Sequence, residues 1–235
     1  MELIFLGTSN ALPSAARKQS GLYLRHEGRG VLLDCGDGIA SALFTREEID
    51  WRELEALVVT HLHLDHCGGL LGLVQLLHVA GLHERFSIAL PDSEGARLLI
   101  ELLPSLHLGP EKLAFPLEVV FYRGPTTFAL AGMNWRPWKS RHTPESHGFI
   151  VEAGEKRVLL SSDLAEANEI SPHAPGADLI VCECAHFWPE DISTALAGCQ
   201  HGPVVLTHMR AELAQQPDRA ARCGIVAHDG LQLQL

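Results

Sequence analysis

Short apolar runs alternate along this chain with longer segments in which apolar residues recur every three or four positions. The short runs predict buried strands at residues 2–6, 22–26, 31–34, 56–60, 86–90, 117–122, 133–139, 148–152, 157–161, 178–182 and 203–207. The longer segments predict helices at about residues 37–44, 68–80, 93–103, 189–198 and 210–222. This alternation of strands and helices indicates an α/β fold.

The last segment of the chain, residues 225–235, has the pattern of a β-hairpin with a turn at Asp229-Gly230. No stretch rich in Pro, Gly and Ser divides the sequence into two parts. We therefore expect residues 1–235 to form a single domain, which is a size that one α/β core can reach.

The composition is that of a globular protein. Of the 235 residues, 46% are hydrophobic and 20% are charged, which excludes a disordered chain. The 18 Lys and Arg residues against 29 Asp and Glu give a formal net charge of −11. Such acidity argues against extended nucleic acid and an anionic membrane surface as partners, although it leaves a local basic cleft open. The 14 histidines direct attention to metal binding.

The sequence shows no targeting or membrane segment. The opening residues, MELIFLGTSN, lack the basic region and the long apolar segment of a signal peptide. The longest apolar stretch, residues 68–82, is too short to cross a bilayer. The six cysteines lack zinc-ribbon spacing, and a chain of this length does not need disulfides. We expect a cytoplasmic protein with reduced thiols.

Five predicted strands end at a residue that can bind a metal or move a proton. These residues are Asp34, His61, Asp163, Glu183 and His208. Functional side chains of open α/β sheets gather at the carboxyl edge of the strands. We therefore expect the five residues to converge in one cleft.

The central motif is THLHLDHCGGL, residues 60–70. In an extended backbone His61, His63 and Asp65 would point to the same side, with His66 where the chain turns into the next helix. Three imidazoles and a carboxylate within six residues predict a nitrogen and oxygen site that suits Zn²⁺, with Fe or Mn²⁺ as alternatives.

Four ligands in one loop cannot complete the coordination of two metal ions. Further candidates are His142 in SRHTPESHGF, Asp163 in LLSSDLAE and His208 in VVLTHMR. Each is a weak signal alone, but together they supply the missing ligands. A bridging Asp163 could hold two cations ~3.5–4 Å apart.

The sequence resembles the metallo-β-lactamase-fold hydrolases, particularly their ribonuclease Z-like branch, in FLGTSNALPSAARKQSGLYL, LLDCGDG, HLHLDHCGGL and the three segments just quoted. This resemblance runs nearly from end to end and implies an αββα sandwich with two metal ions. It assigns His61, His63 and His142 to one ion, Asp65, His66 and His208 to the other, Asp163 to both, and Asp34 to orienting a ligand histidine.

Two features depart from ribonuclease Z enzymes, which usually carry a tRNA-gripping arm before the bridging Asp. Only 21 positions separate His142 from Asp163, which leaves room for a hairpin but for no arm. In VCECAHF, Cys182 stands where that branch usually has a His, while Glu183 remains. The chain is therefore more similar to the small armless phosphodiesterase-like hydrolases of the superfamily.

Two divalent cations would lower the pKa of a shared water and make hydroxide available at neutral pH. Asp65 could then accept a proton, and His186, oriented by Glu183, is the candidate proton donor to the leaving group. An ordinary loop histidine is the alternative for His186. His147 is expected to support the site from outside the metal ligands.

Substrate contacts are indicated only by the stretch WRPWKSRH. Trp138, Lys139 and Arg141 lie there beside His142, and interleaved aromatic and basic side chains can stack a base and hold a phosphate. The alternative is an edge strand with solvated basic residues and buried Trp.

The sequence thus favours a metal-dependent phosphodiesterase for a small phosphodiester, a cyclic nucleotide or an RNA end. Its partner would be a small molecule or nucleotide, and a homodimer is left open. One alternative is a hydrolase of a lactone, thioester or amide with the same two metals. Another is a non-catalytic metal-binding module, which the full ligand set disfavours.

Overall fold

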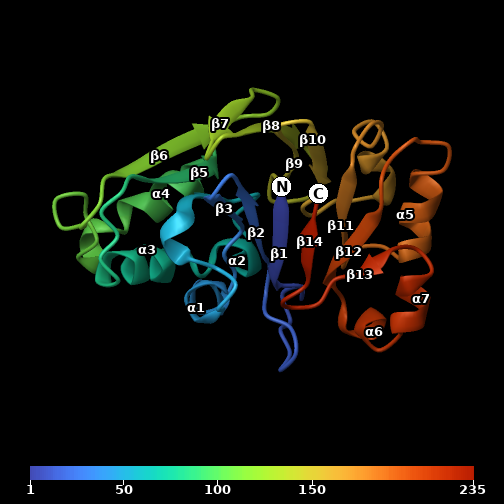
Figure 1. Cartoon of the computed structure of the whole chain (residues 1–235), viewed down its shortest axis with the longest axis horizontal. Coiled ribbons are helices and arrows are strands. Elements are labelled where there is room, and N and C mark those ends of the chain that lie inside the picture. The colour runs from blue at the N-terminus through green and yellow to red at the C-terminus, as the bar shows by residue number, and fades with distance from the viewer.

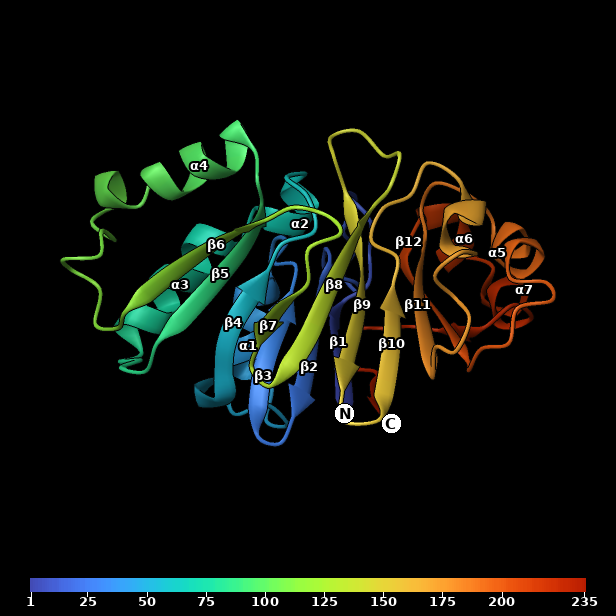
Figure 2. The ribbon, with the colours of Figure 1, turned by 90° about the horizontal axis from the view of Figure 1, so that it is seen from above.

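The computed structural model describes the backbone of all 235 residues and every side chain except those of Ala214 and Pro217. Two mixed sheets of seven strands each face one another, and helices cover their outer sides (Figure 1). The layers follow in the order helix, sheet, sheet, helix, which is plain in the view from above (Figure 2). The αββα sandwich expected from the sequence is confirmed.

The first sheet has the strand order β14-β1-β2-β3-β4-β5-β6. The neighbours from β3 to β6 run parallel, whereas β14, β1, β2 and β3 pair antiparallel. The strands are β1 (Glu2–Gly7), β2 (Gly21–His26), β3 (Arg29–Leu33), β4 (Leu54–Val58), β5 (Phe86–Pro91), β6 (Leu117–Tyr122) and β14 (Gln232–Gln234). The helices of this half are α1 (Ile39–Thr45), α2 (Leu64–Cys67), α3 (Leu70–Val79), α4 (Glu94–Glu101) and short 3-10 turns at Trp51–Glu53 and Pro104–Leu106.

The second sheet has the strand order β13-β12-β11-β10-β9-β8-β7. Here β10 to β13 are parallel and β7 to β10 antiparallel. The strands are β7 (Phe128–Leu130), β8 (Met133–Lys139), β9 (His147–Ala153), β10 (Lys156–Leu160), β11 (Leu179–Cys184), β12 (Val204–Met209) and β13 (Ile225–Val226). The outer layer holds α5 (Pro189–Ala195), α6 (Ala211–Ala214), α7 (Pro217–Ala221) and a 3-10 turn at Ala167–Ile170.

Both faces of the sheets are buried, which explains why so many strands are continuously apolar. In β1, Leu3 and Phe5 point into the core between the sheets, while Ile4 and Leu6 pack against the helices of the first half. Trp135 of β8 meets the inner core from the opposite sheet and is fully buried. Burial of a large side chain of this kind contributes roughly 1.5–3 kcal/mol.

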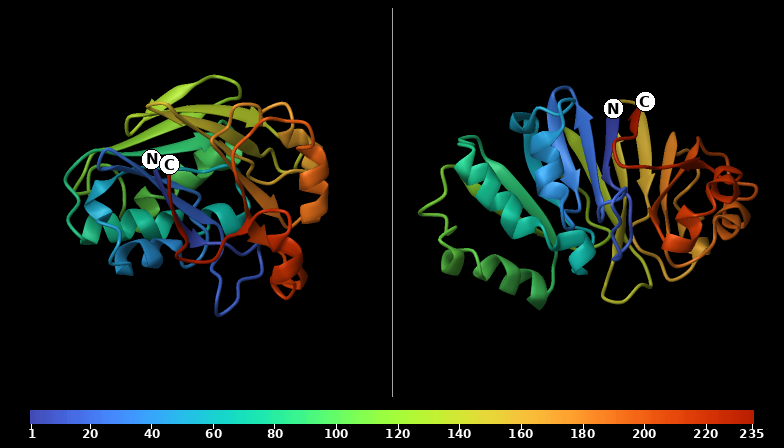
Figure 3. Two further views of the ribbon diagram at one scale, coloured as in Figure 1. Left: turned by 45° about the vertical axis from the view of Figure 1, so that its right-hand side comes forward. Right: turned by 90° about the horizontal axis from the view of Figure 1, so that it is seen from below.

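The predicted hairpin over residues 225–235 is wrong. β13 pairs with β12 in the second sheet, whereas β14 pairs with β1 in the first, so the segment crosses between the two sheets. Asp229 marks the crossing, because its carboxylate accepts hydrogen bonds from the Thr8 hydroxyl and the Lys18 amide, both at 2.8 Å. The turn signal was real, but the unpaired edges of two different sheets decided the partners. The two ends of the chain therefore lie side by side (Figure 3).

The segment after β4 also differs from the expectation. β4 ends at Val58, residues 61–63 form a loop, and residues 64–67 form α2, so the motif is not one extended strand. The predicted helix at 210–222 divides into α6 and α7, and α7 begins at Pro217, a residue that favours the first turn of a helix. No helix in the described part of the chain has the length and hydropathy that a membrane span needs.

Candidate metal centre

Five imidazoles and two carboxylates of the described residues converge at the ends of strands from both sheets. Their donor atoms fall into two groups, each with all atoms within 4.8 Å of one another: His61, His63, His142 and Asp163 form the first, and Asp65, His66 and His208 form the second. The loops that follow β4, β8 and β10 supply the donors of the first group. In the second group, His208 lies on β12. Three of the five strand-end residues, His61, Asp163 and His208, thus meet here, and Asp34 and Glu183 line the hollow beside them.

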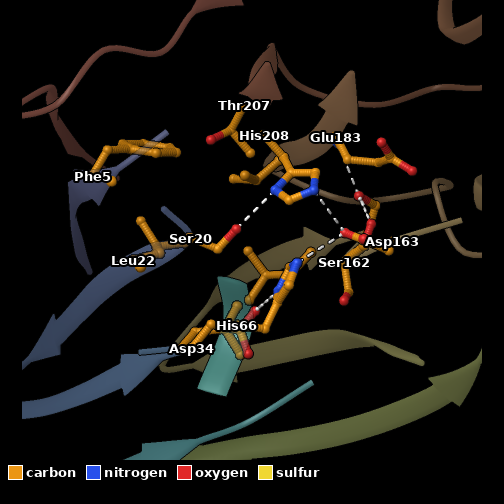
Figure 4. Close-up of a pocket in the computed structure, with 16 residues that line it drawn as sticks. Phe5, Ser20, Leu22, Asp34, His66, Ser162, Asp163, Glu183, Thr207 and His208 are labelled. Atoms are coloured by element: carbon orange, nitrogen blue, oxygen red, sulfur yellow. Dashed lines mark hydrogen bonds and ion pairs between the residues drawn. The ribbon is translucent and has the colours of Figure 1, made fainter. Parts of the chain in front are cut away.

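Asp163 faces both groups, with one carboxylate oxygen for each. Its Oδ2 lies 3.7 Å from His61 Nε2 and 3.8 Å from His142 Nε2. Its Oδ1 lies 3.3 Å from His66 Nε2 and 3.5 Å from His208 Nε2 (Figure 4). Ligands ~2.0–2.2 Å from a tetrahedral Zn²⁺ are separated by similar distances. This spacing would allow one carboxylate to serve two cations.

The chemistry of the buried donors fits cations as well. His66 Nε2 and Asp163 Oδ1 are buried without a hydrogen-bond partner among the described residues, which is costly unless a ligand compensates. Burial lowers the pKa of His61 to about 2, and the neighbouring His66 imidazole contributes to this lowering. Its imidazole is thus neutral at pH 7 and has a lone pair to offer.

One carboxylate and one hydroxyl hold the far sides of the His66 and His61 imidazoles. Asp34 Oδ2 lies 2.7 Å from His66 Nδ1, as the sequence led us to expect, and Asp34 Oδ1 accepts the Thr60 amide at 2.8 Å. The Thr60 hydroxyl lies 3.0 Å from His61 Nδ1. Such contacts fix the orientation of a metal-binding imidazole and increase its basicity.

Ser20 is a site residue that sequence reasoning missed. Its hydroxyl lies 2.8 Å from His208 Nδ1, and its amide donates to the Asp65 carbonyl at 3.1 Å (Figure 4). No local pattern distinguishes Ser20 from the other polar residues of its loop. Thr60 was also missed, although its place directly before His61 was an available signal.

The backbone at the site is strained at three positions. Asp34, Ser162 and His208 have φ values of 60°, 51° and 51°, which non-glycine residues rarely adopt. Each such conformation costs on the order of 1–3 kcal/mol and persists only where the surrounding structure enforces it. Two of the three are site residues and the third precedes Asp163, so the strain is concentrated where donors must be aimed.

We expect Asp34→Asn to weaken metal binding by about 10–100-fold, the range typical of outer partners of ligand histidines. Asn keeps an acceptor for the Thr60 amide but removes the negative charge that faces His66. A competition titration against a chromophoric chelator measures the effect. Asp37→Asn, an exposed position nearby, is the matched control. Equal affinities for the two variants would contradict the orienting role of Asp34.

The His186–Glu183 pair lies beside the two groups. His186 Nδ1 is 2.8 Å from Glu183 Oε1, and the buried carboxylate also accepts the amides of Ala185 at 2.8 Å and His186 at 3.1 Å. The hydrogen bond that His186 donates to Glu183 raises the pKa of His186 despite its partial burial. The rings of His186 and His142 have centroids 4.9 Å apart. The pair thus presents a protonatable imidazole next to the donors.

The ring of His147 does not join the site in the way expected. It packs edge-on against Tyr122, with centroids 5.2 Å apart, and its Nε2 lies 3.4 Å from Glu145 Oε1. Only its backbone amide connects to the motif, through a 3.2 Å hydrogen bond to the Thr60 carbonyl. Support of the site by His147 therefore rests on this backbone bond.

Trp138 is not a stacking platform for a base, so that expectation is wrong. Its side chain is 7% exposed and belongs to the core between the second sheet and its helices. The ring stacks on His173 with centroids 4.3 Å apart. β8 turns this residue inward, because alternate residues of a strand face opposite sides.

The two basic residues predicted to hold a phosphate are already paired with acidic side chains. Lys139 forms an ion pair with Glu145. Arg141 pairs with Glu166 at 2.9 Å and with Glu169 at 3.5 Å. Exposed pairs of this kind are weak, but they place these cations on their own protein partners rather than on the centre.

Two hollows adjoin the centre. The outer hollow, of about 620 Å³, is lined by Asn10, Ala11, Gln19, His63, Leu64, Asp65, Asp163, Ala185, His186 and His208. A smaller one, of about 60 Å³, lies on the side of the core between the sheets, where Phe5 and Leu22 meet Asp34, His66 and Asp163 (Figure 4). A substrate of ordinary size has room only in the outer hollow.

Among known sequences, the chain matches proteins named ribonuclease Z. It is 36% identical over 121 residues to that of Salinibacter ruber, which covers 51% of this chain and 36% of the relative. It is 37% identical over 174 residues to that of Methanocaldococcus jannaschii, which covers 72% of this chain and 52% of the relative. The chain spans about half or less of the length of these relatives.

Among solved structures, the fold is shared over nearly the whole chain. The metallo-beta-lactamase fold protein YhfI from Bacillus subtilis superposes with a TM-score of 0.83 at 17% identity, covering 99% of this chain and 98% of its own. The short form of human tRNase Z gives 0.81 at 21% identity, with 100% and 99% covered. A diphosphatase of the PhnP family gives 0.74 at 17% identity, with 100% and 97% covered.

The family model of the metallo-beta-lactamase superfamily matches residues 17–208. This range includes Ser20, Asp34 and both groups of donors, so the family match and the geometry concern the same part of the molecule. The chain belongs to the metallo-beta-lactamase superfamily.

Proposed function

We propose that this protein is a metal-dependent hydrolase that cleaves a phosphodiester bond in a small substrate. The observation that carries the proposal is the carboxylate of Asp163, whose two oxygens face two separate groups of donors. A binding module needs no such shared ligand, whereas two adjacent cations are a common arrangement for phosphoryl chemistry.

In this proposal His61, His63 and His142 hold one ion, Asp65, His66 and His208 hold the other, and Asp163 contacts both. The ions would supply Lewis acidity and lower the pKa of a water toward neutrality. The nitrogen-rich first group favours Zn²⁺, and Mn²⁺ or Fe is an alternative for the group with more carboxylate. These assignments, like the single domain over residues 1–235, are part of the proposal.

The protein's own groups divide the proton transfers. Asp65 lines the outer hollow and can accept a proton on the carboxylate oxygen that does not face the imidazoles. His186 lines the same hollow and can donate a proton to the leaving group. Glu183 keeps the His186 ring in place and favours its protonated form.

A small substrate agrees better with the structure than an extended RNA. Between His142 and Asp163 this chain has only the hairpin of β9 and β10. The net charge of −11 and the pairing of Lys139 and Arg141 add no attraction for a polyanion. A small phosphodiester, a cyclic nucleotide or an RNA end remains as the substrate class. The cytoplasmic location and a homodimer stay predictions.

The proposal is tested by metal analysis and a parallel substrate panel. After supplementation with Zn²⁺, purified protein is expected to hold about two metal equivalents, as a site of this kind would. It is expected to cleave bis(p-nitrophenyl) phosphate, and a chelator should abolish that activity. A lactone and a thioester serve as comparison substrates. Absence of metal after supplementation contradicts the two-metal centre, whereas turnover of the lactone alone overturns the phosphodiester assignment.

A further inference from the structure

Leu64 is an exposed apolar side chain inside the candidate centre. It is 76% exposed and lines the outer hollow together with Ala11 and Ala185. A solitary exposed leucine on a surface needs no explanation, but this one lies in a concave site. Its position within the hollow makes Leu64 a candidate contact for a bound substrate.

The sequence fixes Leu64 next to both groups of donors. It follows His63 of the first group and precedes Asp65 of the second. Leu64 is also the first residue of α2, with His63 at the N-cap position, so helical geometry holds its backbone. Leu64 and donors of both groups line the same hollow, so a phosphate ester held by the donors shares that hollow with this apolar surface.

The basic side chains near the centre offer little attraction to a second anionic group of a substrate. Each basic residue within three positions of Ser20, His142 or His208 has a described protein partner. Lys18, Lys139 and Arg141 form ion pairs with Asp229, Glu145 and Glu166, respectively. Arg17 donates hydrogen bonds to Thr8 and Ala227, and Arg210 donates one to Ala185. Arg210 is in addition packed over the Trp188 ring at 4.9 Å. The walls of the hollow thus suit an uncharged substituent better than a further phosphate.

We infer that Leu64 forms a subsite for an uncharged apolar substituent of the substrate, such as an aryl or alkyl group. This inference rests on the proposed function and narrows it to monoanionic diesters with one apolar arm. The phosphate lies at the two groups of donors and the apolar arm lies over Leu64 and Ala11. The leaving group faces His186, which belongs to the other half of the sandwich.

A pair of phosphinates, which are monoanionic like a phosphodiester, tests the subsite without any bond cleavage. In the metal-loaded protein we expect methyl(phenyl)phosphinate to bind about tenfold more tightly than dimethylphosphinate, because its ring removes more apolar area from water. Calorimetry measures both affinities. In Leu64→Asn, which keeps the size of the side chain but makes it polar, this ratio should fall to about twofold or less. Leu64→Met should retain it.

The controls separate the subsite from the fold and from the chemistry. Val79→Asn changes another exposed aliphatic residue, 75% exposed, at the C-terminal end of α3. It should leave the ratio of the two affinities unchanged. A ratio that is the same in Leu64→Asn and wild type overturns the inference, as does a wild type that does not prefer the phenyl compound. A Leu64-dependent preference in a protein that cleaves no phosphodiester supports the subsite and overturns the proposed function.

Discussion

Asp163→Asn is expected to lower bound metal from about two equivalents to fewer than one, and to reduce turnover of bis(p-nitrophenyl) phosphate by more than ~100-fold. The reason is that Asp163, alone among the described side chains, has oxygens toward both groups of donors. The amide removes the negative charge that the two groups share. Plasma emission analysis and initial rates on the same samples measure both effects.

The matched control is Asp218→Asn, the same substitution at an exposed position of α7. It should keep wild-type metal content and rate. If Asp163→Asn kept both cations and full turnover, the shared-carboxylate geometry would not be that of a working two-metal centre.

His186→Ala is expected to slow turnover by about 10²–10⁴-fold while metal content stays at the wild-type level. His186 is not among the seven grouped donors, and its Nδ1 is held by Glu183. Its loss therefore removes a proton donor without removing a ligand. The loss should be largest for substrates with poor leaving groups, such as a methyl ester, and smallest for p-nitrophenolate. Equal rates for the variant and the wild type on both substrates would exclude His186 as the acid.

The pH profile checks the same assignment from the other side. Because the hydrogen bond that His186 donates to Glu183 raises the pKa of His186, the protonated acid persists to higher pH than for a free histidine. Activity that needs this proton should fall as the pH rises through the raised pKa. In Glu183→Gln the carboxylate charge is gone, so the fall should move to lower pH, and an unmoved alkaline limb would contradict the pairing.

The strands and the metal motif could be predicted because their signals are local. Most residues on both faces of β1, β4 and β11 are buried, so these strands are largely apolar, with a single Glu in each, and are easily recognised. The donors of residues 61–66 lie so close together in sequence that any fold must keep them near one another. His142, Asp163 and His208 were predicted from the sequence as the further donors, and the structure brings their side chains to the centre as expected.

Other features depended on contacts between distant parts of the chain. Ser20 and His208 are 188 positions apart, and no local periodicity encodes their hydrogen bond. The partners of Lys139 and Arg141, and the inward direction of Trp138, were likewise set by neighbouring elements.

The sequence by itself determined which donor atoms are available, the alternation of strands and helices, and the family to which they point. The tertiary structure decided that the last two strands join different sheets, that Asp163 divides its oxygens between two groups, and that Leu64 faces an open hollow. The physical reason is that side-chain type and hydrophobic period are properties of a short segment. The direction in which a side chain points and the partner that a strand or residue contacts depend on packing, which only the folded chain fixes.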